Sequence, residues 1–282
     1  MILIADSGST KTEWCLVEKD RAPRSFVTGG INPYQQTEEE IDGEIKNVLY
    51  PRVQEDIPLI ESVYFYGAGC AFSEKNRILE EAIHSCIPAR IEVDSDLMAA
   101  ARALCGNQRG IACILGTGSN SCLYDGCTIV EHISPLGFIL GDEGSGAVLG
   151  ERLVGDCLKH QLPEPLIQAF MEQYKLTPAI VLERVYKQPF PNRFLADLSR
   201  FLGDHIEEPS IYGLVYDNFR SFFIRNVMRY TGYEKYEICF VGSIAFYYQE
   251  VLKTAADSLH IRLGTIERGP MDGLIRYHTL YL

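Results

Sequence analysis

Short apolar runs separated by turn residues open the chain. Ile2–Ala5 is apolar and stops at the polar cluster Asp6–Thr12, after which Glu13–Val17 is apolar again. Ser25–Thr28 forms a third run, and Gly29-Gly30 ends it. Runs of this length, bounded by glycine and serine, predict three consecutive β-strands joined by tight turns.

Helical patterns follow and alternate with further strands. Thr37, followed by three glutamates, predicts a helix N-cap and a helix that runs to about Leu49. Another helix is expected from Ser73, with one apolar face. The remaining elements of this part are two strands and a helix, at Ser62–Tyr66, Arg90–Val93 and Asp94–Cys105. The order β-β-β-α-β-α-β-α predicts a mixed sheet with helices on its faces.

The opening pattern recurs after the turn-rich segment 106–110. Ile111–Leu115 is apolar, a glycine-rich turn follows, and Ser121–Tyr124 and Thr128–Ile133 are the next predicted strands. Residues 144–227 read as mostly helical, and Glu237–Val241 as a buried strand. A last strand near Ile261–Leu263 and a short helix after Pro270 complete the tail. We therefore expect two domains of the same fold, 1–108 and 109–282, with a cleft between them.

Charge and cysteine content narrow the class of protein. The 282 residues carry a formal net charge of −12, which disfavours nucleic acid as a partner. The nine cysteines are scattered and include no CxxC pair, so we interpret them as reduced thiols in a reducing compartment. The apolar start of the chain stops at Asp6, too early for a signal peptide, and no run is long enough to span a membrane. We expect a soluble, cytoplasmic protein.

Two glycine-rich turns are the first candidates for chemistry. In Asp6-Ser-Gly-Ser-Thr-Lys-Thr, Gly8 allows backbone N–H groups to approach phosphate oxygens, and Ser9, Thr10 and Lys11 add donors. Asp6, at the end of a strand, is the predicted Mg²⁺ ligand. Leu115-Gly-Thr-Gly-Ser-Asn repeats this logic in the second half. Each turn alone reads equally well as a plain hairpin, but their recurrence favours a nucleotide site.

Acidic residues supply the other candidates. In Asp94-Ser-Asp96 we interpret Asp94 as a helix N-cap and Asp96 as a general base for phosphoryl transfer. In Gly141-Asp-Glu-Gly-Ser-Gly, Asp142 is suited to accept hydrogen bonds from sugar hydroxyls, although Asp142 and Glu143 could equally cap the next helix. The small residues after Phe240-Val241 leave room for adenine or ribose.

These motifs together resemble the BadF/BadG/BcrA/BcrD-type ATPase family, and within it the N-acetylglucosamine kinases. The similarity rests on DSGSTKT, LGTGSN, GDEGSG and VGSIA, which occur in the family's order over essentially the whole chain. The resemblance implies an α/β fold of duplicated RNase H-like domains, as in the actin, hexokinase and Hsp70 superfold. It also implies an ATP-dependent sugar kinase that uses Mg²⁺.

The resemblance also assigns residues to roles. Asp96 falls on the position of the catalytic base, and Asp6 belongs to the first phosphate motif. The positions expected to contact ATP are Ser7, Gly8, Ser9, Thr10, Lys11, Thr117, Gly118, Gly242 and Ser243. Those expected to contact the sugar are Asn32, Asn120 and Asp142. The family's first motif usually reads DGGGTKT, so Ser7 and Ser9 stand here in place of glycines.

Two alternatives remain open. The family includes ATPases that activate radical dehydratases through a shared iron–sulfur cluster, but no cysteine lies in the GDEGSG region of this chain. A non-catalytic sugar sensor of the same fold is the other alternative, and the retention of Asp6 and Asp96 argues against it. The expected substrate is N-acetylglucosamine, phosphorylated at its 6-hydroxyl by family resemblance alone. Other amino sugars and a homodimeric state are left open.

Overall fold

The computed structural model describes residues 1–8, 10–70 and 73–279 and divides into two compact units. Unit 1 comprises Met1–Gly106 with Pro270–Leu282, and unit 2 comprises Asn107–Gly269. The break after Gly106 lies close to the predicted boundary at residue 108. The tail differs from the prediction, because its helix belongs to unit 1 and not to the second domain. Among the residues described, none of the helices is both long and apolar enough to cross a membrane.

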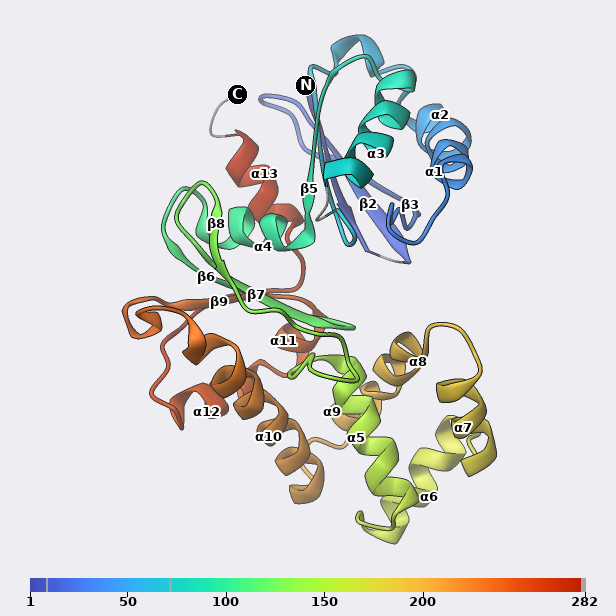
Figure 1. Cartoon of the computed structure of the whole chain (residues 1–282), viewed down its shortest axis with the longest axis vertical. Coiled ribbons are helices and arrows are strands. Elements are labelled where there is room, and N and C mark those ends of the chain that lie inside the picture. The colour runs from blue at the N-terminus through green and yellow to red at the C-terminus, as the bar shows by residue number, and fades with distance from the viewer. Residues whose placement is uncertain (9, 71–72, 280–282) are drawn as a thin grey trace. The chain divides into compact units, whose positions relative to one another are not determined.

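Unit 1 is built on a five-stranded mixed sheet in the order β3-β2-β1-β4-β5 (Figure 1). Its strands are β1 (Ile2–Ser7), β2 (Lys11–Val17), β3 (Arg24–Gly29), β4 (Ser62–Gly67) and β5 (Arg90–Ser95). The first three form an antiparallel meander, whereas β1, β4 and β5 run parallel. The near-continuous apolar sequence of β1 follows from this position, because both faces of the central strand are buried.

Helices cover both faces of this sheet. They are α1 (Glu38–Glu44), the π-helical turn η1 (Ile45–Leu49), α2 (Tyr50–Val53), the 3₁₀ turn η2 (Ile57–Leu59), α3 (Ser73–Cys86), α4 (Asp96–Cys105) and α13 (Met271–Thr279). Leu3 and Ala5 pack in one cluster with residues of α1 to α3. Ile2 and Ile4 pack on the opposite face with α4 and α13. The apolar side chains of α13, Met271 and Leu274, explain why the end of the chain joins unit 1.

The predicted start of the first helix is confirmed. The Thr37 side chain accepts a hydrogen bond from the Glu40 N–H, and the Glu40 side chain accepts one from the Thr37 N–H, which completes a capping box. The helical path runs further than predicted, because η1 and α2 extend it to Val53.

Unit 2 repeats the same sheet. Its order is β10-β9-β6-β7-β8, with strands β6 (Gly110–Leu115), β7 (Ser119–Tyr124), β8 (Ile129–His132), β9 (Ile238–Val241) and β10 (Leu263–Glu267). As in unit 1, the first three strands in sequence are antiparallel neighbours, and the central strand pairs in parallel with the fourth. The predicted duplication of one fold is therefore confirmed.

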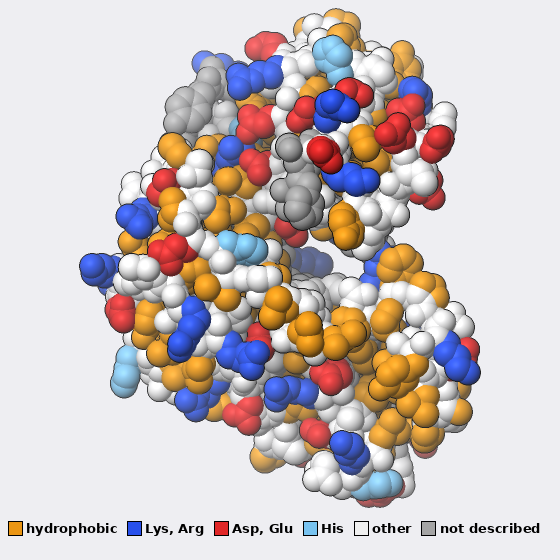
Figure 2. All heavy atoms as spheres, in the orientation of Figure 1, with side chains coloured by type: hydrophobic (Ala, Val, Ile, Leu, Met, Phe, Trp, Pro, Cys, Tyr) orange, Lys and Arg blue, Asp and Glu red, His pale blue; other side chains and the backbone are white. Residues whose placement is uncertain are grey.

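The helices of unit 2 form a larger set. They are α5 (Gly146–Leu158), α6 (Glu164–Gln173), α7 (Pro178–Tyr186), α8 (Pro191–Leu198), α9 (Arg200–Asp204), α10 (Pro209–Arg225), η3 (Val227–Arg229), η4 (Tyr233–Lys235), α11 (Ser243–Tyr247) and α12 (Gln249–Asp257). One core joins them to the sheet. Apolar side chains also gather on the surface that carries α7 and α8 (Figure 2), where Leu182, Tyr186 and Phe190 are exposed.

Close packing of α5 against α8 fixes the helix that follows the GDEGSG segment. A Cβ atom at Gly150 would collide with the carbonyl oxygen of Leu195, whereas one at Gly155, on the same helix, would meet nothing within 4 Å. The two glycines therefore have opposite structural requirements.

We expect Gly150→Ala to lower the free energy of unfolding by about 1–3 kcal/mol, because the added methyl group forces the two backbones apart. Gly155→Ala is the matched control and should be neutral or stabilising by up to about 1 kcal/mol, since alanine is the better helix former. Urea unfolding followed by circular dichroism measures both. Equal destabilisation by the two variants would contradict the packing described.

Candidate functional site

In unit 1, strand register brings two aspartates to one edge of the sheet. Ser7, Gly67 and Ser95 are partners across β1, β4 and β5, so the three parallel strands end at the same level. Asp6 is the penultimate residue of β1, and Asp96 is the first residue of α4, directly after β5. The two carboxylates are close enough for the charge of Asp96 to raise the pKa of Asp6. The structure thus places the predicted base beside the predicted metal ligand.

The Asp6 carboxyl has an unusual charge state. Its pKa is raised to about 7, mainly by burial and then by the negative charges of Asp96 and Glu13, which Lys11 partly opposes. An aspartate in this position gains from a nearby cation, which would neutralise the repulsion. A hard divalent cation such as Mg²⁺, which takes one or two carboxylate ligands, fits this donor set.

The turn between β1 and β2 presents the predicted phosphate-binding groups. The Gly8 N–H donates to the Lys11 carbonyl oxygen over 3.0 Å, and Gly8, Thr10 and Lys11 are exposed. Among the residues that the structure describes, a Cβ atom at Gly8 would meet only that carbonyl oxygen, at 3.8 Å, so packing against them does not require a glycine. Ser9 lies outside the described residues.

The Ser7 hydroxyl group forms hydrogen bonds within unit 1. Its side chain is buried, and its Oγ lies 2.7 Å from Thr12 Oγ1. The same oxygen donates to the Ile31 carbonyl oxygen over 2.9 Å and accepts from the Ile31 N–H over 3.0 Å. The hydroxyl group is therefore used within the fold, where it joins the end of β1 to the segment that carries Asn32.

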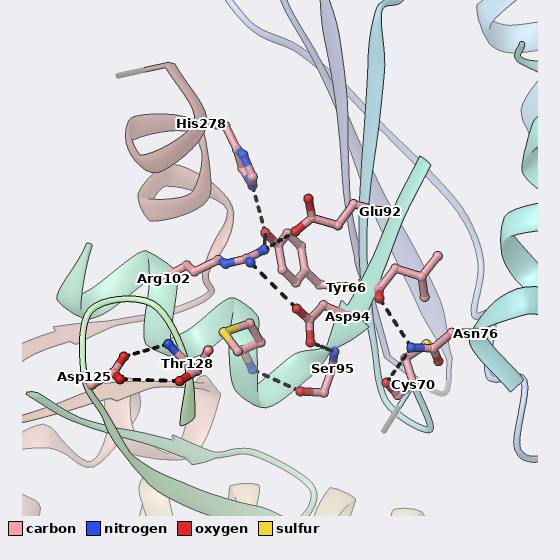
Figure 3. A network of polar contacts seen from close by, with 12 residues as sticks. Tyr66, Cys70, Asn76, Glu92, Asp94, Ser95, Arg102, Asp125, Thr128 and His278 are labelled. Carbon is pink, nitrogen blue, oxygen red and sulfur yellow. Dashed lines mark hydrogen bonds and ion pairs between the residues drawn. The ribbon is translucent and has the colours of Figure 1, made fainter. Parts of the chain in front are cut away.

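The start of α4 corrects the interpretation of Asp94. Ser95 is the N-cap, because its Oγ accepts from the Met98 N–H over 3.1 Å. Asp94 is the penultimate residue of β5, and its Oδ1 accepts from the Ser95 N–H over 2.9 Å. Its Oδ2 lies 3.8 Å from Arg102 Nη2 (Figure 3). Both Ser95 and Asp94 have side chains that suit a cap, so composition alone could not separate them.

Asn32, predicted to bind the sugar, is buried in unit 1. Its Oδ1 accepts from the Tyr34 N–H over 3.0 Å, and its backbone N–H donates to Gln36 Oε1 over 2.7 Å. The side chain packs against Gly69, where a Cβ atom would collide with it. These contacts hold the loop after β3 in a fixed conformation.

In unit 2, the glycine turn after β6 is held by the first turn of α5. The N–H groups of Gly146 and Ala147 donate to the carbonyl oxygens of Gly116 and Thr117, over 2.8 and 3.1 Å. Thr117 is exposed, and a Cβ atom at Gly116 would meet nothing within 4 Å. The turn is therefore rigid and open, as an anion site built from backbone groups requires.

Asp142 lies against this turn. A Cβ atom at Gly118 would come within 3.1 Å of Asp142 Oδ2, and the Ser119 N–H donates to the Asp142 carboxylate. Burial raises the pKa of Asp142 to about 6, which the Ser119 hydrogen bond opposes and the charge of Glu143 reinforces. The backbone of Asp142 is left-handed, with φ of 54°. Strained residues of this kind often occur at functional sites.

Glu143 does not cap the next helix. Its Oε1 lies 2.5 Å from Arg225 Nε, and its Oε2 accepts from Asn226 Nδ2 over 3.3 Å. The N-cap of α5 is Ser145, whose Oγ accepts from the Val148 N–H. Neither acid of the pair therefore caps α5, and Glu143 instead fixes the loop to the end of α10.

The remaining candidates of unit 2 lie on β7 and after β9. Asn120 Oδ1 accepts from the Ser121 N–H over 3.0 Å and lies 2.8 Å from His132 Nε2. Gly242 has φ of 120°, and a Cβ atom there would collide with the Leu115 carbonyl oxygen, so the fold itself requires this glycine. Ser243, at the start of α11, is exposed.

A protein-type metal cluster is absent from the described part of the chain, where no three or more His, Cys, Asp or Glu side chains gather. Mg²⁺ bound mainly by phosphates and water needs no such cluster. The residues thus divide between two sheets of the same topology, each with a glycine turn after its central strand. This is the architecture of duplicated RNase H-like domains, the actin-like ATPase fold.

Comparisons with known structures narrow this class. No protein-family model matches the chain, and no curated protein matches it. A candidate N-acetylglucosamine kinase from Porphyromonas gingivalis is 50% identical over 100% of this chain and 99% of that one, with a TM-score of 0.96. A second, from Chromobacterium violaceum, is 18% identical over 98% and 99% of the chains, with a TM-score of 0.75. A non-polymerising MamK mutant bound to AMPPNP is 14% identical over 99% and 98%, with a TM-score of 0.57.

The second and third likenesses show the fold alone. The first, at half identity over the full length, shows the family: this chain belongs to the family of the P. gingivalis protein, the N-acetylglucosamine kinase-like proteins.

The charge state of Asp6 gives a test of the site without substrate. Its folded-state pKa of about 7 lies above the unfolded value, so ionisation opposes folding, and the penalty grows between about pH 4 and pH 7. Asp6→Asn escapes the penalty. We expect the variant to raise Tm relative to wild type more at pH 8 than at pH 5, and excess Mg²⁺ to reduce the difference.

Differential scanning fluorimetry measures these shifts. Asp20→Asn, which changes an exposed turn carboxylate of the same unit, is the control and should show no such pH dependence. A Tm difference between Asp6→Asn and wild type that is the same at both pH values would contradict the raised pKa of Asp6.

Proposed function

We propose that this protein is an ATP-dependent kinase that phosphorylates N-acetylglucosamine at its 6-hydroxyl group. The observation that carries the proposal is the pair of carboxylates, Asp6 and Asp96, at the ends of the parallel strands beside the exposed turn after β1. A relative at 50% identity that is a candidate N-acetylglucosamine kinase supports the choice of acceptor. The 6-hydroxyl rests on family resemblance.

Each unit contributes groups for the nucleotide. In unit 1, we assign the turn of Gly8, Thr10 and Lys11 to phosphate oxygens, together with the backbone at Ser7 and Ser9. In unit 2, we assign the turn of Thr117 and Gly118 to the same role, and Gly242 and Ser243 to the ribose or adenine. Glycines at Gly8 and Gly116 that packing does not require are explained by a ligand that comes close to the backbone.

Asp96 is the proposed general base. Its carboxylate takes the proton of the acceptor hydroxyl as that oxygen forms a bond to the γ-phosphorus, the bond from the γ-phosphorus to the bridging oxygen breaks, and ADP leaves. Mg²⁺ held near Asp6 would screen the negative charge of the phosphates. Asn32, Asn120 and Asp142 are assigned to the sugar. We place the protein in the cytoplasm, where ATP and reduced thiols occur together, because its nine cysteines are scattered along the sequence and include no CxxC pair.

The direct test is an ADP-release assay with MgATP over a panel of hexoses and hexosamines, with a reaction lacking sugar. We expect N-acetylglucosamine to give the highest kcat/KM. Asp96→Asn should keep sugar binding and lower kcat by about 10²- to 10⁴-fold. Asp257→Asn, at the end of α12, is the matched control and should keep full activity.

Full activity of Asp96→Asn would disprove the assigned base. ADP release that ignores every sugar would instead support an ATPase activator, and sugar binding without turnover by wild type would support a sensor.

Asp142 allows the sugar assignment to be tested separately. Asn also adopts left-handed backbone conformations, so Asp142→Asn removes the charge and leaves the loop intact. We expect this variant to raise KM for the sugar about tenfold or more, with KM for ATP little changed, because it loses an acceptor for hydroxyl groups. Steady-state kinetics with each substrate varied in turn measures this. A rise in KM for ATP alone would assign Asp142 to the phosphate turn that it contacts.

A further inference from the structure

A network of polar side chains joins α4, β4, β5 and α13 of unit 1 (Figure 3). At its centre is Arg102, whose side chain is only 13% exposed. Arg102 Nη1 donates to the Tyr66 hydroxyl oxygen over 2.6 Å and to Glu92 Oε1 over 2.7 Å. One guanidinium group therefore contacts both of the strands, β4 and β5, that carry the end of the sheet.

The register of the sheet shows which part of it the Arg102 side chain contacts. Asp6, Tyr66 and Asp94 are partners across β1, β4 and β5. Arg102 contacts Tyr66 through Nη1 and Asp94 through Nη2. Both contacts are made at the same level of the sheet as Asp6. Arginine suits this role because its planar group presents several donors in fixed directions.

Asp94 connects Arg102 to the start of α4, which carries Asp96. One of its carboxylate oxygens accepts from the Ser95 N–H, and the other faces Arg102. Ser95 in turn caps α4, whose first residue is Asp96. The path from Arg102 to Asp96 thus consists of two residues whose side chains are both held by hydrogen bonds or charge.

The C-terminal helix completes the network. His278 Nε2 lies 2.8 Å from the Tyr66 hydroxyl, and the His278 ring stacks on Tyr64 with centroids 3.8 Å apart. Because Arg102 donates to the Tyr66 oxygen, the Tyr66 hydroxyl hydrogen is available to donate to a neutral His278. Burial lowers the pKa of His278 to about 4, which keeps it neutral.

The helix α13 also packs closely against α4. A Cβ atom at Gly273 would lie 2.5 Å from the Ala103 carbonyl oxygen, one residue after Arg102. The helices α13 and α4 are thus in backbone contact beside the polar network. Movement of α4 along the sheet would break this contact together with the Arg102 hydrogen bonds.

We propose that Arg102 is a positioning residue that holds Asp96 in place through Asp94 and Ser95, and that Tyr66 and His278 of the C-terminal helix keep Arg102 in its working orientation. The inference rests on the proposed role of Asp96 as the base. It adds that the end of the chain controls how well that base is aligned, although no residue of α13 is assigned to a substrate.

The experiment compares Arg102→Met and Tyr66→Phe with wild type. We expect kcat to fall about 10- to 100-fold in Arg102→Met and less in Tyr66→Phe, because a misplaced base loses rate steeply with small displacements. Both KM values should stay within about threefold of wild type. The double variant should lose less than the product of the two single losses, since both residues belong to one network.

Ile83→Val is the matched control. It trims a fully buried side chain in the other cluster of unit 1 and tests whether general destabilisation explains the result. We expect a lowered Tm with unchanged kcat. If this control loses as much kcat as the network variants at equal loss of Tm, or if KM rises while kcat holds, the positioning role is wrong.

Hydrogen–deuterium exchange of residues 94–99 provides a readout that needs no turnover. We expect faster exchange there in both network variants and no change in Ile83→Val. If Arg102→Met does not fold, kcat and the exchange of residues 94–99 in Tyr66→Phe decide the question. Values unchanged from wild type in Tyr66→Phe would overturn the proposal. If wild type turns over no sugar, the proposed function fails, while the exchange result still decides whether Arg102 orders the turn.

Discussion

Parallel pairing of β1, β4 and β5 is the constraint on which the rest of the site depends. It brings to one edge the carboxylates of Asp6 and Asp96, which lie about ninety residues apart in the chain. Burial is the main cause of the raised pKa of Asp6, and repulsion by the negative charge of Asp96 adds to it. The fold tolerates it because strand hydrogen bonds and two apolar clusters hold the sheet independently of the charges. A bound cation would lower the remaining repulsion between the two carboxylates.

In unit 2, backbone hydrogen bonds and the contacts of Glu143 hold the glycine turn and the loop that follows. Its glycine turn is kept open and rigid by the carbonyl oxygens that accept from the first N–H groups of α5. Those N–H groups are therefore used within the protein, and an anion would meet the turn itself. Glu143, tied to Arg225 and Asn226, fixes the loop that carries Asp142. Glu143 thus has a structural part in this loop.

Much of this arrangement could be predicted from local sequence. Glycine, serine and threonine in the two turns, and Thr37 with Glu40, have short-range physical meaning that a single sequence reveals. The N-cap of α4 was assigned wrongly to Asp94, because both Asp94 and Ser95 suit a cap and only the hydrogen bond from the Met98 N–H to Ser95 Oγ distinguishes them. The inward orientation of the Ser7 hydroxyl also depends on a distant partner, Ile31. The place of α13 in unit 1 depends on pairing residues from opposite ends of the chain, which no local pattern encodes.

That last feature has a consequence for biosynthesis. The core around Ile2, Ile4, Ala99 and Ala103 gains Met271 and Leu274 only when the final helix has left the ribosome. Until then the first-made unit carries its glycine turn and both aspartates without the helix that closes over Tyr66. A nascent chain from which α13 has not yet emerged therefore lacks part of the unit 1 core. Completion of that core waits for α13, however early the rest of unit 1 is synthesised.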